Sequence, residues 1–224
     1  MKRREFVLIP AKALGGALLY SLMGGLIPAD AQESVEVPLR FFTAEEAKIV
    51  QAAAARIFPT DESGPGATEA GVVVYIDRQL ASGYGRDQYR YTQGPWVEAD
   101  ERLFGYQGKD TPQDTYRAGI GLLGSAFLAL SPQEQDRRLE AIESTRFFQM
   151  LREHCIEGVM CDPMHKGNNN LVGWKLIGYP GPQLSYIGDI DAFPGKAYRV
   201  APESLAEILG HPVTPVEDEA NPIL

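Results

Sequence analysis

The fold class is decided by residues 43–59, which read TAEEAKIVQAAAARIFP. Thr43 and Glu46 have the spacing of a capping box, in which each side chain binds the backbone N–H of the other at the start of a helix. Pro59 ends the pattern because proline cannot continue a helix. The apolar residues between these ends share one helical face: Ala47, Val50, Ala54 and Ile57. The stretch therefore predicts an amphipathic helix over residues 44–58.

Five further helices are expected along the chain. They cover residues 69–80, 112 toward 130, a segment that begins at Ser131-Pro132, residues 145–157 and residues 202–209. Several begin with a Ser or Thr cap followed by proline, which are typical helix starts. A strand over residues 72–76 is the alternative to the first, and the apolar period that continues to Leu80 favours the helix. With long Gly/Pro-rich connections between them, these segments predict a mostly α, irregular helical domain.

Composition sets the class of protein. The 224 residues are 44% hydrophobic and 23% charged, which is typical of a globular domain. The formal net charge is -9, from 21 Lys and Arg against 30 Asp and Glu. Binding to a phosphate backbone needs clustered surplus Lys and Arg, so the charge argues against nucleic acid as a partner.

The N-terminus has the form of an export signal. Arg3 and Arg4 are followed by Phe6, an apolar stretch covers residues 7–28, and residues 29–31 (ADA) have the small-x-small form of a cleavage site. The paired arginines resemble the twin-arginine signal, whose pathway transports folded proteins.

These features divide the chain into two parts. We expect a twin-arginine-type export signal over residues 1–31 and a single helical domain over residues 32–224, with an extended tail from Pro212. An uncleaved membrane anchor is the alternative for the first part, because residues 7–28 are just long enough to span a bilayer as a helix.

The two cysteines leave three interpretations open. Cys155 and Cys161 would lie in an oxidising compartment after export, and a disulfide between them requires the helix to break, with Gly158 as the candidate break. Two free buried thiols are the second interpretation. The third is a zinc site with four ligands within twelve residues, although no C-x-x-C pair is present. Its ligands would be His154, Cys155, Cys161 and His165.

Catalytic motifs are missing from the sequence. There is no G-x-S-x-G, no Walker-type phosphate loop, no H-E-x-x-H and no G-x-G-x-x-G that opens a βαβ unit, and the only histidines are His154, His165 and His211. Residue chemistry therefore predicts no catalytic site and no cofactor in this chain.

Two segments outside the helices draw attention. Residues 83–96 contain Tyr84, Tyr89, Tyr91 and Trp96, which either form an interface or cover the core. Residues 158–182 are dense in Gly, Asn and Asp, which tolerate positive φ, and therefore predict one folded loop with tight turns.

Several short segments, in order along the chain, resemble the gluconate 2-dehydrogenase subunit 3 family, the small subunit of flavin-dependent sugar and polyol dehydrogenase complexes. The resemblance extends from about residue 42 to residue 182 and includes the twin-arginine-like signal. Its segments are residues 56–61 (RIFPTD), 66–72 (GATEAGV), 76–80 (IDRQL), 157–158 (EG), 162–163 (DP), 167–168 (GN) and 173–182 (GWKLIGYPGP).

The resemblance implies a mostly helical accessory subunit that does not turn over substrate itself. In such complexes a GMC-type flavoprotein large subunit holds FAD and oxidises the sugar or sugar acid, and a multihaem cytochrome c often takes the electrons through c-type haem. The small subunit would stabilise the flavoprotein in a chaperone-like role and carry it to the periplasm through the twin-arginine translocation machinery. Membrane association would come through the complex or through an uncleaved signal.

An interface with the large subunit is expected in the folded loop, on the basis of its turn residues and aromatic side chains. The residues expected there are Asp162, Pro163, Gly167, Asn168, Trp174, Tyr179 and Pro180.

Two alternatives stay open for the function. The same small subunit would also suit a glucoside 3-dehydrogenase or a glucose, fructose or sorbitol dehydrogenase complex. A stand-alone periplasmic protein that binds a metal or another ligand through the Cys/His cluster is the alternative of a different class.

Overall fold

The computed structural model describes residues 38–97, 99–198 and 200–211. Arg3, Arg4 and Phe6 of the expected export signal, and the expected tail from Pro212, lie outside these residues. No helix in the part that the structure describes combines the length and apolarity needed to cross a membrane.

The described chain is mostly helical, as the sequence predicts, and no strand occurs between residues 38 and 211 where the structure describes them. The α-helices are α3 (Ala44–Ile57), α4 (Val72–Ala81), α5 (Glu101–Phe104), α6 (Pro112–Leu123), α7 (Pro132–Glu140), α8 (Arg146–Met160), α9 (Val172–Ile177), α10 (Ile187–Ile190) and α11 (Leu205–Ile208). The 3-10 helices are η2 (Ser125–Ala129), η3 (Pro163–His165) and η4 (Asn169–Leu171).

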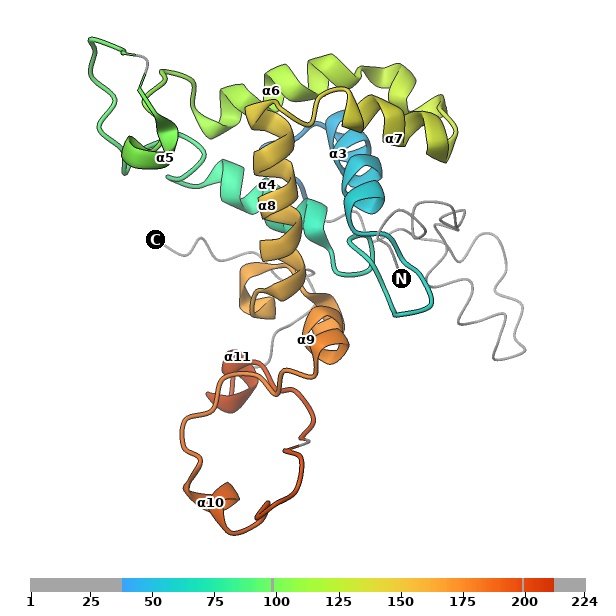
Figure 1. The fold of residues 1–224 in the computed structure, drawn as a ribbon, viewed down its shortest axis with the longest axis vertical. Coiled ribbons are helices and arrows are strands. Elements are labelled where there is room, and N and C mark those ends of the chain that lie inside the picture. Colours follow the sequence, from blue (N-terminus) through green and yellow to red (C-terminus); the bar gives the residue numbers. More distant parts are fainter. Residues whose placement is uncertain (1–37, 98, 199, 212–224) are drawn as a thin grey trace.

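The longest helix, α8, organises the bundle. It packs against α3, α4 and α6 along its length and against α9 at its C-terminal end (Figure 1). Helix α3 also contacts α4, α6 and α7. Two segments project from this bundle: residues 87–97 and 99–106, which carry α5, and residues 183–198 and 200–203, which carry α10 (Figure 1).

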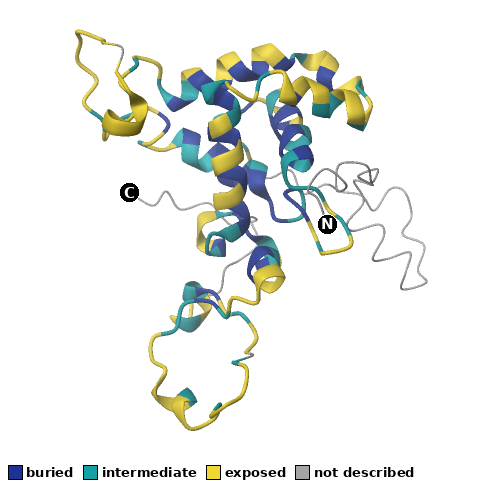
Figure 2. Cartoon of the chain, viewed as in Figure 1, coloured by how far each residue is buried: buried dark blue, intermediate teal, exposed yellow. Residues whose placement is uncertain are grey.

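The core is a single cluster of apolar side chains from these helices. The small side chains Ala53 and Ala54 let α3 approach its neighbours closely, while Tyr116 and Phe127 fill the space beneath α6 and η2. Burial follows the inner faces of the helices, whereas both projecting segments are largely exposed (Figure 2). Apolar packing therefore stabilises the bundle and contributes little in the two projections.

Most expected helices form, with corrected ends. The capping box of Thr43 and Glu46 is present at the start of α3. Helix α4 begins at Val72 rather than at residue 69, because Gly71 before it has φ of 73°, and the alternative strand over residues 72–76 does not form. The helix expected to run from residue 112 toward 130 ends at Leu123, because Gly124 has φ of 70° and breaks it. The expected helix 202–209 is shortened to α11, which Ser204 caps.

A buried carboxylate fixes the start of α3 against α4. The side chain of Asp77 is fully buried and accepts hydrogen bonds from three successive backbone N–H groups, those of Arg40, Phe41 and Phe42, at 2.8, 3.0 and 2.9 Å. The Arg78 guanidinium donates to the same carboxylate at 2.6 Å. Because a buried carboxylate is costly unless its oxygens are satisfied, these contacts together hold the segment before α3 on α4.

A second buried ion pair joins α3 to α7. The guanidinium of Arg56, with the residue 5% exposed, donates to both oxygens of Asp136 at 2.7 and 3.0 Å. This two-point geometry sets the orientation of α7 as well as its position.

Replacement of Asp77 by alanine should destabilise the fold. Three backbone N–H groups would lose their acceptor and the carboxylate volume would become a void, so we expect a loss of about 3–5 kcal/mol in the free energy of unfolding. Chemical denaturation followed by circular dichroism measures this loss. Asp110→Ala, at an exposed aspartate, is the control and should leave the midpoint nearly unchanged. Equal midpoints for the two variants would contradict the role of Asp77.

Candidate functional site

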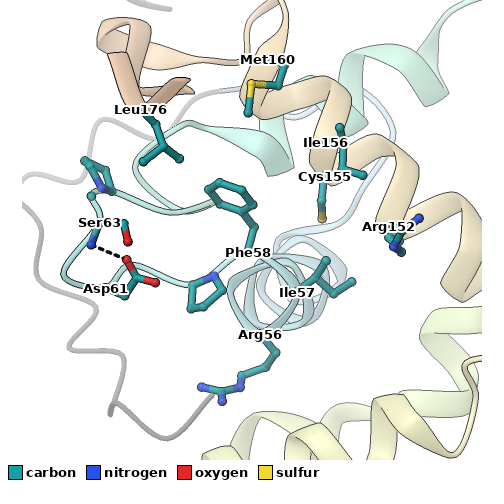
Figure 3. A pocket seen from close by; sticks show the side chains of 13 residues that line it. Arg56, Ile57, Phe58, Asp61, Ser63, Arg152, Cys155, Ile156, Met160 and Leu176 are labelled. Atoms are coloured by element: carbon teal, nitrogen blue, oxygen red, sulfur yellow. Dashed lines mark hydrogen bonds between the residues drawn. The ribbon is translucent and has the colours of Figure 1, made fainter. Parts of the chain in front are cut away.

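A pocket of about 480 Å³ lies between the C-terminal end of α3, the loop over residues 58–65 and one face of α8 (Figure 3). Leu176 of α9 reaches it from the other side. Its lining is mostly apolar and comprises Arg56, Ile57, Phe58, Pro59, Asp61, Ser63, Gly64, Pro65, Arg152, Cys155, Ile156, Met160 and Leu176.

The loop that borders the pocket is held in one conformation by its own hydrogen bonds. Asp61 and Gly64 exchange two backbone hydrogen bonds of 3.1 Å, and the Ser63 N–H donates to the Asp61 carboxylate at 2.7 Å. The Gly66 N–H donates to the side chains of Thr60 and Glu69. A Cβ on Gly66 would lie 2.5 Å from the Thr60 nitrogen, so this position requires glycine.

Two polar side chains of the pocket lining are engaged within the chain, and a third is chemically inert. Arg56 binds Asp136, and Asp61 accepts from Ser63. Burial raises the pKa of the Cys155 thiol to about 12, so the thiol stays protonated and is a poor nucleophile at neutral pH. No histidine lines the pocket. The pocket can therefore hold an apolar group, and its lining provides neither a histidine base nor an activated thiol.

The buried histidine of α8 is a structural residue. His154 is 3% exposed, with the Tyr84 hydroxyl 3.0 Å from Nε2 and the Tyr116 hydroxyl 2.8 Å from Nδ1. Desolvation lowers the pKa of His154 from 6.5 to about 4, so the ring is neutral at pH 7. A neutral imidazole has one donor and one acceptor nitrogen, and the two hydroxyls satisfy both.

The tyrosines around His154 are also kept in their neutral form. Desolvation raises the pKa of Tyr84 to about 12 and that of the fully buried Tyr116 well above its usual value of 10. Burial, and the neighbouring Glu157 carboxylate to which the Tyr75 hydroxyl donates at 3.0 Å, also raise the pKa of Tyr75. This network fastens residue 84 and α6 to α8 and contains no group that changes charge near pH 7.

The structure holds Cys155 and Cys161 as free thiols. Helix α8 does not break at Gly158 but continues to Met160, so the break on which a disulfide depends is absent. Burial raises the pKa of Cys161 to about 11.

The residues of the expected zinc site are dispersed. His154 faces Tyr84 and Tyr116, Cys155 faces the pocket, and His165 is exposed on η3. Among residues 38–211, as far as they are described, no three His, Cys, Asp or Glu side chains group closely enough to hold a metal ion. The adjacent positions 154 and 155 diverge because neighbouring residues of a helix lie about 100° apart around its axis.

The segment over residues 158–182 is folded, as expected, and contains the end of α8 together with η3, η4 and α9. Asn168 lies at its centre, fully buried, with φ of 50°. Its side chain donates to the carbonyl of Cys161 at 2.9 Å and accepts from the Gly173 N–H at 2.8 Å. Its backbone N–H donates to the Gly158 carbonyl at 2.7 Å. Asn168 therefore ties the C-terminal end of α8 to α9.

Glycines allow these elements to approach one another. A Cβ on Gly173 would lie 2.0 Å from the Val159 carbonyl oxygen, and one on Gly167 would lie 2.3 Å from that of Gly158. On the other side, a Cβ on Gly71 would lie 2.3 Å from the Asn169 amide nitrogen, and the Asn169 N–H donates to the Ala70 carbonyl at 3.1 Å. The segments 66–72 and 167–173 thus fit together through backbone contacts that side chains would block.

The residues expected at a partner interface have contacts within the chain. Trp174 is 4% exposed and donates from Nε1 to the Met160 carbonyl at 2.7 Å, and Asp162 accepts from the backbone N–H groups of Met164 and Leu205. Pro163, Gly167 and Asn168 are buried, Pro180 is half-buried, and Tyr179 is exposed. The aromatic side chain of Trp174 therefore serves the domain's own helices.

The sequence did not single out two groups of residues. Asp77 lies on the buried face of α4 with Ile76 and Leu80, next to the partly buried Val73, and a carboxylate inside an apolar stripe is the signal that identifies it. Leu103 and Phe104 of α5 are 75% and 67% exposed, and nothing in the local pattern marks them.

Comparison with known families finds one match. The family model described as Gluconate 2-dehydrogenase subunit 3 matches residues 44–181, which include α3 to α9 and the junction around Asn168. No curated protein and no solved structure matches the chain.

Replacement of His154 should change how stability depends on pH. The folded state rejects the proton that the unfolded histidine binds below its pKa of 6.5, so folding stability is lost as the pH falls from 6.5 to about 4. The full loss is on the order of 3 kcal/mol. Denaturation titrations across this range should give a shallower pH dependence for His154→Gln. His165→Gln, at an exposed site, should retain the wild-type slope, and parallel slopes for all three proteins would contradict the assignment.

Two glycine-to-alanine variants should have opposite effects. Gly173→Ala places Cβ against the Val159 carbonyl, so we expect a loss of about 2–3 kcal/mol in the free energy of unfolding. Gly121→Ala, within α6, meets nothing within 4 Å and should stabilise the protein by about 0.5–1 kcal/mol. Thermal denaturation separates the two, and a neutral Gly173→Ala would show that α9 does not need this close contact.

Proposed function

Because the chain belongs to the gluconate 2-dehydrogenase subunit 3 family, it is an accessory subunit of a dehydrogenase complex, and we propose its specific role. It is the non-catalytic small subunit of a periplasmic, FAD-dependent sugar or sugar-acid dehydrogenase such as gluconate 2-dehydrogenase. It is needed for export and stability of a GMC-type flavoprotein subunit. The family match over residues 44–181 is the observation that carries this proposal.

The chemistry of the described residues supports a non-catalytic role. Oxidation of a sugar alcohol needs a base that accepts the hydroxyl proton, and a base is most effective with a pKa near the working pH. Desolvation lowers the pKa of His154 to about 4, and the ring is enclosed between Tyr84 and Tyr116; no histidine lines the pocket. An accessory subunit does not need such a base, so the described residues are compatible with this role.

FAD is assigned to the partner subunit. Dinucleotides are typically bound where a strand leads through a Gly-rich turn into a helix. The described part of this chain has no strand, and its G-x-G-x-x-G match, Gly119 to Gly124, lies in the end of α6 and its C-cap instead of in a turn that follows a strand. Its residues thus do not fit FAD, and a multihaem cytochrome c would be a third subunit that takes the electrons.

Export would be shared between the subunits. A flavoprotein must fold around FAD before transport, so only a pathway for folded proteins can move it. The Arg3-Arg4 pair provides such a signal in this chain, and a stable complex would let one signal serve both subunits. We therefore propose a periplasmic location through the twin-arginine pathway, with membrane association through the complex or an uncleaved signal.

The substrate belongs to the partner. The same small subunit would fit a glucoside 3-dehydrogenase or a glucose, fructose or sorbitol dehydrogenase, because the substrate pocket would lie in the flavoprotein. The stand-alone metal-binding alternative loses support, since His154, Cys155 and His165 have separate surroundings.

Affinity purification of the C-terminally tagged full chain from the periplasm of its native host tests the role. We expect a flavin absorbance spectrum and a GMC-type partner identified by mass spectrometry. Arg3→Lys with Arg4→Lys keeps the charge but removes the paired arginines, and should leave both subunits in the cytoplasmic fraction. Lys2→Arg with Lys12→Arg is the matched control and should export normally.

Three results would refute the proposal. The first is a tagged chain that purifies without flavin. The second is continued export of the flavoprotein with the Arg3→Lys, Arg4→Lys chain, which would remove the carrier role. The third is reduction of an electron-accepting dye by the purified chain alone with gluconate or glucose, which would show that the chain is catalytic.

A further inference from the structure

One projecting segment exposes large apolar side chains. We name residues 87–97 and 99–106 the aromatic arm; it carries α5 and projects away from the bundle (Figures 1 and 2). Six of its apolar side chains are between 42% and 86% exposed: Tyr89, Tyr91, Trp96, Val97, Leu103 and Phe104. Several large exposed apolar side chains gathered in one segment are uncommon on a protein without partners and indicate an interaction site.

The base of the arm is fixed to the helical bundle. Immediately before it, the Tyr84 hydroxyl lies 3.0 Å from His154 Nε2, and the Gly85 carbonyl accepts from the Gln113 N–H at 3.1 Å. At its other end, the Arg146 guanidinium lies 3.4 Å from the centre of the Tyr106 ring. Both ends of the arm are therefore anchored, one to α8 and α6 and the other to α8.

Arg90 holds the two sides of the arm together. Its guanidinium forms an ion pair with Asp87 and donates to the Gly108 carbonyl at 2.9 Å. It also lies 5.0 Å from the ring centre of Tyr106 and 6.0 Å from that of Trp96. One side chain thus links the first and last parts of the arm through charge, hydrogen bonds and cation–π contacts.

An arm built in this way is ready to bind. Its internal contacts involve the base and Arg90, while the apolar side chains on its outside contribute little to folding. A preorganised surface loses less conformational entropy on binding than a flexible one. The contacts of Arg90 and of the base thus order a segment whose large apolar side chains the domain itself leaves uncovered.

The exposed area is sufficient for a stable complex. A large aromatic side chain has about 150–250 Å² of surface, so the six side chains at their exposed fractions offer on the order of 700 Å². A stable, specific interface buries about 800 Å² on each partner. The arm with its immediate surroundings reaches that size.

Ion pairs offset half of the acidic charge of the arm. Arg90 pairs with Asp87 and Arg102 pairs with Asp100 at 2.8 Å, whereas Glu98 and Glu101 leave the sequence of residues 87–106 with a formal charge of -2. Pairing of the two arginines reduces the cost of removing them from water. Exposed tyrosine, tryptophan and phenylalanine are the side chains that contribute most at protein interfaces.

We infer that the aromatic arm is the docking surface for the catalytic flavoprotein subunit, inserted into an apolar cleft of that partner. This inference rests on the proposed function, and it locates the contact away from residues 158–182, most of whose aromatic and turn residues are used within the chain. The second projection, residues 183–198 and 200–203, exposes five large apolar side chains, of which Tyr186 alone is aromatic, whereas four of the six in the arm are aromatic. It returns to the bundle through the Glu203 N–H, which donates to the Pro180 carbonyl.

Co-purification with matched double variants tests the inference. The tagged full chain carries either Leu103→Ser with Phe104→Ser in the arm, or Leu184→Ser with Ile187→Ser in the second projection, where the residues are 71% and 79% exposed. All four positions are exposed, so folding should be unchanged, and the thermal midpoint of each isolated chain checks this. We expect the arm variant to retain at least about tenfold less flavoprotein per tagged chain. The control pair should retain the wild-type amount.

Further measurements make each outcome decisive. In the purified complex, hydrogen exchange should be slower in residues 87–97 and 99–106 than in the chain alone. If the wild-type chain retains no flavoprotein, the proposed function fails. If the wild type retains it and the arm variant retains as much, or if both variants lose it equally, the function stands and the arm assignment is overturned. Dimerisation of the isolated chain that the arm variant abolishes would assign the surface to a second copy and would also overturn the inference.

Discussion

The helical domain depends on the burial of the Asp77 carboxylate. A charge with no exposed surface is tolerated only because three successive N–H groups and a guanidinium surround it. This arrangement fixes the segment that leads into α3, and α3 in turn contacts α4, α6, α7 and α8. An electrostatic requirement on α4 thereby determines where the preceding helix, α3, begins.

Other polar groups in the interior follow the same rule. His154 has a tyrosine on each ring nitrogen, Asn168 joins two backbone groups across the end of α8, and Arg56 binds both oxygens of Asp136. A buried polar group stabilises the fold when its hydrogen bonds are formed, and removing its partner costs free energy. The same property makes these groups unsuitable for reaction, because catalysis needs groups that can change partner or protonation state. The chemistry of the interior is thus explained by folding alone.

Sequence reasoning predicts the parts of this structure that rest on local physics. Capping residues and apolar spacing place α3, the start of α7 and the start of α8 correctly, since a cap and a helical face depend on neighbouring residues. The start of α4 after Gly71 and the end of α6 before Gly124 are missed. A glycine permits a positive φ, but packing decides whether it adopts one. The role of Trp174 is missed for a related reason: its partner is the Met160 carbonyl, which becomes available only once α8 has ended beside it. The arm escapes prediction because exposure is a property of the whole fold.

The distribution of apolar surface connects the fold with the role of a subunit. In the core, Ala, Val and Tyr side chains are covered and polar groups are paired, so the domain is self-sufficient there. In the aromatic arm, by contrast, large apolar side chains are exposed to water. Contacts through Arg90 and Tyr106 nevertheless order this segment. Water contact with such surface is unfavourable by about 25 cal/mol per Å². A segment that is both ordered and uncovered is therefore complete only when a second protein covers it, which is the condition expected of a chain whose family consists of subunits.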